Sequence, residues 1–314
     1  MRGHVLISVM MAVYNDVSLL PMAIESVRAQ SYGDWELLIM DNSDSNPQAW
    51  EMLTEYRKSD ERIRIFRSPG HEGHINVGWP KASSLLLKEV RGDYVFFLAA
   101  DDSLDEDAFL WVSEEAERHD PDVVWVGNAY MNYEGGEVNL LDTAVAEYRY
   151  FTVAQRQEAV QYILANVYYN TMFHFCRVSF LREHHIDFFD PYYSDCAAMT
   201  AVLCMAERMV VLDRIVYYLT VNTSQTAGRV TTTFYRMFAM QWRLLREVYE
   251  DGDERKRFAA ARVLRNFNSN LTNLISGAAC RDEYMNPIEA DETERLRIAG
   301  EAMNDSMIME MSEM

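Results

Sequence analysis

The stretch DYVFFLAADDS at residues 93–103 decides the fold of this chain. Residues 95–100 carry no charge and are rich in β-branched and aromatic side chains, which predicts a buried central strand of an α/β sheet. Asp101 and Asp102 follow this strand directly. Open α/β sheets bind their ligands at this end of their strands, so the pair is a candidate functional site.

The pair Asp101–Asp102 has two interpretations on this segment alone. Adjacent carboxylates repel each other, and their burial is unfavourable unless something compensates the charge. A hard divalent cation would compensate both and would offer open positions to a diphosphate. Alternatively, the pair caps the next helix, since residues 103–109, SLDEDAF, have the composition of a helix start.

Composition narrows the class of protein. The chain has 314 residues, of which 49% are hydrophobic and 12% aromatic, enough for one large core or two smaller ones. Its net charge of −20 argues against binding along a nucleic-acid backbone and against broad adhesion to anionic lipid, because both depend on Lys and Arg. The cysteines Cys176, Cys196, Cys204 and Cys280 show neither CxxC pairing nor zinc-ligand spacing, so we expect free thiols in a reducing compartment.

The expected location is cytoplasmic. No apolar stretch approaches the ~20 residues of a membrane span. Residues 5–11, VLISVMM, begin too early and are too short a run for a signal peptide. We therefore expect a soluble protein, with peripheral contact at the inner face of the membrane as a second interpretation.

The first part of the chain alternates short apolar runs with amphipathic stretches. Candidate strands lie at 5–11, 36–40, 63–67, 94–98 and 123–126, and candidate helices at 18–30, 48–59, 75–90 and 105–119. This alternation predicts a mostly parallel sheet with right-handed crossovers. The pair Gly135–Gly136 predicts a hairpin turn.

The pattern changes after about residue 138. We expect a helix at 155–166, a strand at 172–176, a helix with an apolar face at 196–208, and short strands at 209–212 and 215–221. Beyond residue 229 the pattern is purely helical, and the acidic, Met-rich tail from about residue 303 is expected to fray.

Three further polar groups stand at the ends of predicted elements. Tyr14 follows the first strand and could stack on a planar base, or simply pack in its loop. Asp41 ends the next strand and could accept a hydrogen bond from a base or a ribose, or serve as a turn residue. Asp195 precedes an apolar helix, whose dipole would keep it ionised, although an ordinary N-cap has the same position.

These segments occur in the order found in the family-2 glycosyltransferases of the GT-A fold, which the chain resembles. The family shows a strand ending in P-x-Y-N, a helix ending in S-x-x-x-Q-[ST]-Y and a strand ending in V-D-D-x-S. The matching pieces here are VYN at 13–15, SVRAQSY at 26–32 and MDNS at 40–43. Residues 92–102, GDYVFFLAADD, resemble its G-[DE]-Y-[IV] strand and metal-binding aspartates, and residues 188–195, FFDPYYSD, the segment that ends in its general base.

The resemblance covers about residues 4–225 and implies an α/β fold of the GT-A type. It implies a nucleotide-binding, mixed, mostly parallel sheet flanked by helices, with a C-terminal helical extension. We expect residues 1–127 to form the half that binds the nucleotide sugar and residues 128–228 the acceptor-binding and catalytic half of the same domain. Residues 229–314 would be the helical extension with its frayed tail.

The resemblance also assigns roles to individual residues. The base pocket would be lined by Ala12, Val13, Tyr14 and Asp16, with Asp41 binding the base and Asn42 beside it. Asp101 would approach the ribose or the sugar and belong to the metal site. Asp102 would ligate Mn²⁺ or Mg²⁺, and Asp195 would be the catalytic base. Lys81 is the nearest candidate for a basic residue facing the diphosphate, with His71 and His74 behind it.

Five positions depart from the family's pattern. Ala12 stands for its proline, Asn42 for a second aspartate, Ala99 for an acidic residue, Ser84 for an asparagine and Ser194 for a glutamate. The metal site therefore relies on the adjacent aspartates alone.

The implied activity is an inverting, metal-dependent transfer of a sugar from a nucleoside diphosphate, with UDP favoured, to a hydroxyl acceptor. The acceptor would be a glycan or a lipid-linked precursor, as in polysaccharide biosynthesis. The alternatives are a catalytically silent nucleotide-sugar-binding or scaffold protein and a nucleotidyltransferase. The last would need a Gly-rich basic loop after the first strand, and residues 11–16, MAVYND, offer none.

The helical stripe of Phe, Met and Trp beyond residue 229 lies outside the resemblance. Such a stripe is typical of core packing or of a contact between identical subunits. Docking on a membrane surface toward a lipid-linked acceptor is the second interpretation.

Overall fold

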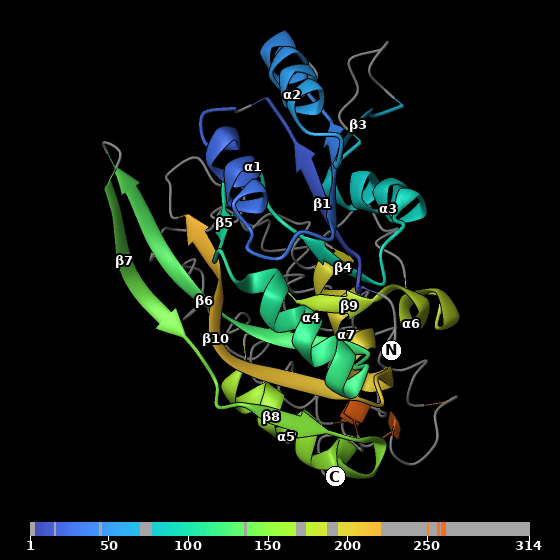
Figure 1. Ribbon diagram of the computed structural model, residues 1–314. Coiled ribbons are helices and arrows are strands. Elements are labelled where there is room, and N and C mark those ends of the chain that lie inside the picture. Colours follow the sequence, from blue (N-terminus) through green and yellow to red (C-terminus); the bar gives the residue numbers. More distant parts are fainter. Residues whose placement is uncertain are drawn as a thin grey trace, which may run out of the picture.

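The computed structural model describes residues 4–15, 17–43, 46–69, 77–134, 137–167, 174–186 and 194–220, and a few residues between 250 and 261. These residues form one ten-stranded sheet with helices on both faces (Figure 1). The expected helical extension at 229–314, like His71, His74, Asp16 and Cys280, lies outside the described residues apart from those few near 250–261.

The first part of the chain is a run of strand–helix units. Its elements are β1 (Ile7–Val13), α1 (Leu20–Arg28), β2 (Trp35–Asp41), α2 (Pro47–Ser59), β3 (Ile63–Arg67), α3 (Trp79–Glu89) and β4 (Tyr94–Phe97). The four strands pair in parallel in the order β3-β2-β1-β4. The predicted strands and crossover helices are confirmed, because each lies within a few residues of its expected bounds.

The second part contributes antiparallel strands as well. Its elements are β5 (Ser103–Leu104), α4 (Ala108–His119), β6 (Val123–Glu134), β7 (Glu137–Ala144), β8 (Arg149–Phe151), α5 (Arg156–Asn166), β9 (Phe175–Arg177), α6 (Val178–Glu183), α7 (Ser194–Met205) and β10 (Met209–Thr220). The hairpin expected around residues 135–136 is confirmed as the antiparallel pair β6–β7.

Two expectations for this part were wrong. The strands expected at 209–212 and 215–221 form one strand, β10, which keeps its pairing with β6 across a register shift between Val211 and Ile215. The helix expected from residue 105 begins at Ala108, because Ser103 and Leu104 pair with β10 as β5 instead.

The sheet is mixed, with most strands in one direction. Its order is β3-β2-β1-β4-β9-β6-β10-β5, with β7 beside β6 and β8 beside β10. Strand β9 is antiparallel to both β4 and β6, so β6 and β10 run in the same direction as β1 to β4. The carboxyl ends of these strands therefore meet at one edge, called here the carboxyl edge, and their starts form the opposite amino edge.

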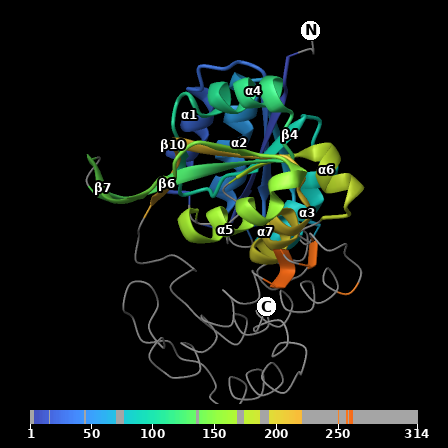
Figure 2. The same cartoon turned by 90° about the horizontal axis from the view of Figure 1, so that it is seen from below.

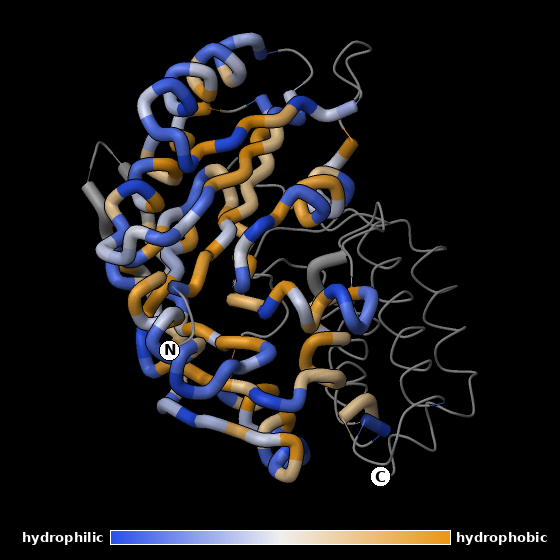
Figure 3. The backbone as a smooth tube through the Cα atoms, turned by 45° about the vertical axis from the view of Figure 1, so that its right-hand side comes forward, coloured by the Kyte–Doolittle hydropathy of each residue, from blue (hydrophilic) through white to orange (hydrophobic). Residues whose placement is uncertain are grey.

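Each face of the sheet buries its own apolar cluster. Helices α1, α2 and α4 cover one face, and α3, α5, α6 and α7 cover the other. Figure 2 shows these two groups on opposite sides of the strands. The most apolar segments are the strands between the helix layers (Figure 3). Burial on both faces explains why the strands are continuous apolar runs.

Two earlier expectations concern free cysteine thiols and membrane-spanning segments. Cys176 and Cys204 are free and buried, and burial raises the pKa of each to about 12. None of the helices in the described ranges has both the length and the apolar character needed to cross a membrane.

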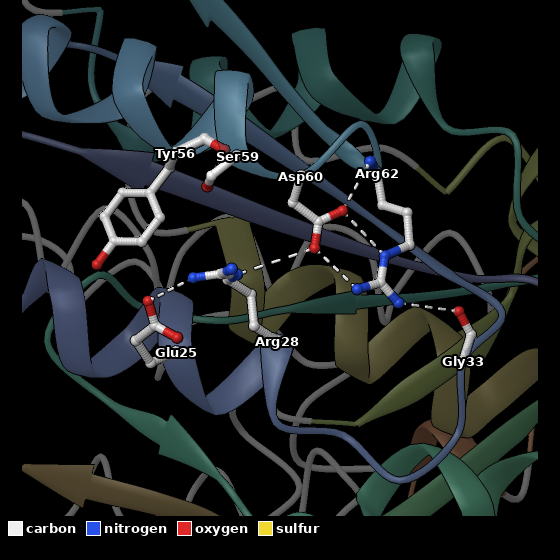
Figure 4. Close-up of polar contacts among 7 residues, drawn as sticks. All are labelled: Glu25, Arg28, Gly33, Tyr56, Ser59, Asp60 and Arg62. Carbon is white, nitrogen blue, oxygen red and sulfur yellow. Dashed lines mark hydrogen bonds and ion pairs between the residues drawn. The ribbon is translucent and has the colours of Figure 1, made fainter.

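Buried and half-buried carboxylates at the amino edge are paired with arginines. Asp122, directly before β6, accepts hydrogen bonds from Arg177 and from the backbone N–H groups of residues 207 and 208. Glu36, near the start of β2, accepts from Arg64 at 2.9 Å. Asp60, before β3, accepts from Arg62 at 2.8 Å, as Figure 4 shows. These ion pairs fix the strand starts in place.

Candidate active site

The carboxyl ends of β1, β2 and β4 bring the predicted donor-binding residues together. Val13 at the end of β1 lies opposite Asp41 at the end of β2, and the N–H of Asn42 donates to the carbonyl of Val13 at 2.9 Å. On the other side of β1, the N–H of Leu98 donates to the carbonyl of Met10 at 2.9 Å. The loops after these three strands therefore start side by side at the carboxyl edge.

The loop after β1 is tied to the loop after β2. The N–H of Asn15 donates to Oγ of Ser43 at 3.0 Å, and Nδ2 of Asn46 donates to the carbonyl of Asn15 at 2.6 Å. Asn15 has φ of 55°, a left-handed conformation that asparagine tolerates better than most residues. Tyr14 beside it is 48% exposed, so this aromatic ring reaches the surface next to the strand ends.

Asp41 and Asn42 are buried and organise their surroundings. Asp41 is 1% exposed, and one of its carboxylate oxygens accepts from the N–H of Ser43 at 3.1 Å. Oδ1 of Asn42 accepts from the N–H of Val77 at 3.0 Å, just before α3. The ring of Trp79 at the start of α3 lies 5.1 Å from that of Phe97 in β4. The first turn of α3, which carries the half-buried Lys81, therefore also lies near this edge.

The acidic turn, residues 99–102, is attached to β10. Asp102 is 4% exposed, and its Oδ2 accepts from the hydroxyl of Tyr217 at 2.5 Å. Its Oδ1 accepts from the N–H of Thr220 at 2.7 Å. The N-cap of α4 is Asp107, whose side chain makes no capping bond. Asp102 therefore bonds to β10 and does not cap α4, so the helix-capping alternative is wrong for this residue.

Burial changes the protonation of Asp102. Desolvation, and secondly the nearby Asp101 carboxylate, raise its pKa to about 7, while its bonds from Tyr217 and Thr220 act in the opposite direction. Asp101 is more exposed than Asp102. The acidic turn therefore holds one carboxylate with a strongly unfavourable charge and a neighbour closer to the surface.

A glutamine holds the segment that follows the acidic turn. Nε2 of Gln30, at the end of α1, donates to the carbonyl of Asp105 at 2.5 Å, and its Oε1 accepts from the N–H of Phe109 at 3.0 Å. Sequence reasoning placed Gln30 in a family motif without a role and missed Tyr217 and Thr220 altogether. Their contacts span more than a hundred residues, so no local pattern could reveal them.

Asp195 lies at the start of α7, as its second residue, and its side chain is outside the described part of the structure. The other end of α7 is held by Arg156, which is 3% exposed and donates to the carbonyls of Cys204 and Met205 at 2.6 and 3.2 Å. Because β10 starts soon after α7 ends, this end lies at the amino edge, and the helix start is about 18 Å away for twelve residues.

The donor set suits a cation that arrives with a diphosphate. Within the described residues no group of three or more His, Cys, Asp or Glu side chains could hold a metal ion by itself. Mg²⁺ is commonly held by one or two carboxylates together with substrate phosphates. The adjacent Asp101 and Asp102 fit that arrangement, and the unfavourable charge of the buried Asp102 is what a cation would relieve.

Part of the chain is similar in sequence to known proteins. Protein y4gI of Sinorhizobium fredii is 41% identical over 116 residues, which cover 36% of this chain and 12% of y4gI. Escherichia coli WfgD, a UDP-Glc:alpha-D-GlcNAc-diphosphoundecaprenol beta-1,3-glucosyltransferase, is 30% identical over 112 residues, which cover 36% of this chain and 38% of WfgD. The chain thus matches well under half of the length of these relatives.

A solved structure matches over nearly the whole chain. The crystal structure of residues 1–349 of S. aureus TarS in complex with UDP-GlcNAc superposes with a TM-score of 0.74, covering 98% of this chain and 83% of that one at 16% identity. This likeness confirms the GT-A-like fold. The sequence model of Glycosyl transferase family 2 matches residues 8–182, more than half of the chain. The chain therefore belongs to glycosyl transferase family 2.

Proposed function

We propose that the protein transfers a sugar, with inversion, from a UDP-sugar to a hydroxyl acceptor at the carboxyl edge, with the help of a divalent cation. One observation carries the proposal. Two buried carboxylates at this edge, Asp41 and Asp102, accept hydrogen bonds from backbone N–H groups and a tyrosine hydroxyl, whereas those at the amino edge accept from arginines. Within the described ranges no arginine or lysine forms an ion pair with either carboxylate, and such a ligand-binding edge suits a cation and donor groups.

The nucleotide would bind over the ends of β1 and β2. The exposed ring of Tyr14 would offer a stacking face for the base, and Ala12, Val13 and Asp16 would line the same pocket. Asp41 and Asn42 would accept and donate hydrogen bonds at the base. UDP is the preferred carrier, since TarS was crystallised with UDP-GlcNAc and WfgD is named for UDP-Glc.

The cation would bind at the acidic turn. The resemblance placed both aspartates in the metal site, with Asp102 as the ligand and Asp101 also near the ribose or the sugar. Because both oxygens of Asp102 already accept hydrogen bonds from β10, we propose that Asp101 supplies the outward ligand and Asp102 holds the turn. A divalent cation held there would stabilise the negative charge that develops on the leaving diphosphate. Lys81 in the first turn of α3 would add a second positive charge.

The acceptor would be activated by Asp195. A hydroxyl has a pKa far above 7, so a carboxylate must remove its proton as it attacks. Because Asp195 is the second residue of α7, the helix dipole would favour its ionised form. Attack from the side opposite the diphosphate inverts the anomeric carbon in one displacement.

The acceptor half would be residues 128–228, and the donor half residues 1–127. A lipid-linked saccharide is the proposed acceptor class, because WfgD is named for a diphosphoundecaprenol-linked sugar. Such an acceptor would bring the protein to the inner face of a membrane as a peripheral protein.

The experiment measures UDP release from UDP-GlcNAc and UDP-Glc, with and without Mn²⁺ and with diphosphoundecaprenol-linked GlcNAc as acceptor. We expect Mn²⁺-dependent turnover that falls by at least about 100-fold in Asp195→Asn, as removal of a general base does. Arg214→Gln, in an exposed ion pair of β10, is the control and should match the wild type. Unchanged turnover in Asp195→Asn would remove that residue from its role. Binding without turnover with any donor or acceptor would favour the silent binding protein.

A further inference from the structure

Strand β10 pairs through its backbone with the segment that follows the acidic turn. The N–H of Asp105 donates to the carbonyl of Val216 at 3.0 Å. Leu104 lies opposite Tyr217 and Ser103 opposite Tyr218 in an antiparallel pair. The chain that leaves the acidic turn is therefore fixed as the edge strand β5.

The hydroxyl of Tyr217 forms hydrogen bonds to two residues of the acidic turn. It accepts from the N–H of Ala99 at 3.2 Å and donates to Oδ2 of Asp102 at 2.5 Å. Tyr217 is fully buried, and its ring packs 5.8 Å from that of Phe96 in β4. Burial and the nearby Asp102 carboxylate raise the pKa of this hydroxyl, so it keeps its proton and acts as a donor. One atom thus bonds both ends of the acidic turn.

The second oxygen of Asp102 is also directed at β10. Its Oδ1 accepts from the N–H of Thr220, three residues after Tyr217. Rotation of the Asp102 carboxylate away from β10 would break both bonds and leave a buried donor unsatisfied. The side chain is therefore held in one orientation, and the path of the backbone at the neighbouring Asp101 is held with it.

The fixed conformation of the acidic turn is important for cation binding because the turn has few carboxylates. The acidic residue that the family often has two positions before Asp101 is Ala99 in this chain, and only its backbone N–H takes part, through Tyr217. A cation with so few protein ligands depends on how accurately each is placed, and hydrogen-bonding partners behind a ligand provide that accuracy.

We propose that Tyr217 is a positioning residue for the cation–diphosphate site. Its hydroxyl sets the acidic turn so that Asp101 meets the cation. This inference rests on the proposed function, since it concerns the site that would hold the cation and the diphosphate. Tyr217 acts only through the turn and touches neither donor nor acceptor.

The test compares Tyr217→Phe with Tyr218→Phe. Both variants keep the ring and lose one hydroxyl, but the hydroxyl of Tyr218 bonds to Asp105 at 3.2 Å, outside the acidic turn. Free Mn²⁺ is measured by its electron paramagnetic resonance signal as it is titrated into UDP-saturated protein. Circular dichroism gives the folded fraction, and binding is expressed per folded molecule. UDP binding without metal is measured in parallel.

In Tyr217→Phe we expect Mn²⁺ affinity to fall roughly 10-fold, the usual effect of removing a partner behind a metal ligand. Tyr218→Phe should stay within about twofold of the wild type. UDP binding without metal should be the same in all three proteins. In an Asp102→Asn background, Tyr217→Phe should add less than its full loss, because one of the two bonds of its hydroxyl goes to that carboxylate.

Three results would overturn the inference. Mn²⁺ affinity of Tyr217→Phe within about twofold of the wild type would do so, and so would equal losses in Tyr217→Phe and Tyr218→Phe. A full additional loss in the Asp102→Asn background would mean that Tyr217 acts by another route. A wild type that binds UDP with no contribution from Mn²⁺ would instead remove the metal-dependent function, and the inference with it.

Discussion

The two edges of the sheet treat buried carboxylates differently. At the amino edge Asp122, Glu36 and Asp60 each face an arginine. At the carboxyl edge Asp41 and Asp102 are as deeply buried as Asp122 and Glu36, yet they accept from backbone N–H groups and the hydroxyl of Tyr217.

One of these carboxylates at each edge has a shifted pKa, and the two shifts have opposite signs. Arg62 lowers the pKa of Asp60, as expected for a carboxylate paired with a cation. Burial raises the pKa of Asp102 to about 7. The buried carboxylates Glu36 and Asp122 have arginine partners, whereas no arginine or lysine in the described part of the chain pairs with Asp102, which favours a ligand that brings the positive charge. The predictions below test this comparison.

The largest effect is expected at the amino edge. Asp122→Ala leaves the Arg177 guanidinium and two backbone N–H groups without their acceptor. Removing one partner of a buried ion pair costs about 3–5 kcal/mol, and urea unfolding should show a loss of that size. As a control, Asp213→Ala breaks an exposed pair with Arg214 and should cost less than about 1 kcal/mol. Similar losses in both variants would contradict the structural role of Asp122.

At the carboxyl edge, replacing a buried carboxylate is expected to raise the stability of the fold. Asp102→Asn removes an unfavourable buried charge, while its Oδ1 still accepts from the N–H of Thr220. Without nucleotide or metal, the melting temperature should rise by about 2–4 °C, which corresponds to roughly 1 kcal/mol. Mn²⁺-dependent nucleotide binding should weaken at the same time, because substitutions that stabilise a protein at a functional site often reduce its function. A melting temperature clearly below the wild type would make Asp102 an ordinary structural residue.

The smallest effect concerns Asp60 and depends on pH. Its pKa is lowered in the folded state, so its contribution is complete above the unfolded pKa of about 3.9 and is lost as the pH falls through the folded value. At pH 7, Asp60→Asn should cost about 1 kcal/mol, since Arg62 and Arg28 then lose their partner (Figure 4). Unfolding curves of the two proteins should converge in acid. A constant difference at all pH values would mean that charge is not the cause.

Local sequence pattern predicted much of this fold because much of it is local. The buried strand before Asp101 and the units β1 to α3 were all visible as apolar runs and amphipathic periods. The start of α4 and the continuity of β10 were mispredicted, because both depend on the pairing of β10 with β5 and β6.

The site shows the same limit. Asp41, Asp101 and Asp102 could be identified because each follows a predicted strand. The hydrogen-bond partners of Asp102 could not, because Tyr217 and Thr220 are 115 and 118 residues away in the chain. The side chains of Asp16 and Asp195 lie outside the described residues, so their roles stay predictions.

The central claim is that the carboxyl edge binds a cation and a nucleoside diphosphate together. Calorimetric titration of UDP, with and without Mn²⁺, into the wild type, Asp101→Asn and Asp60→Asn tests it directly. We predict that Mn²⁺ tightens UDP binding to the wild type and to Asp60→Asn equally, and that Asp101→Asn loses this gain by about 10–100-fold. Equal Mn²⁺-dependent binding by Asp101→Asn, or no UDP binding by the wild type, would contradict the claim.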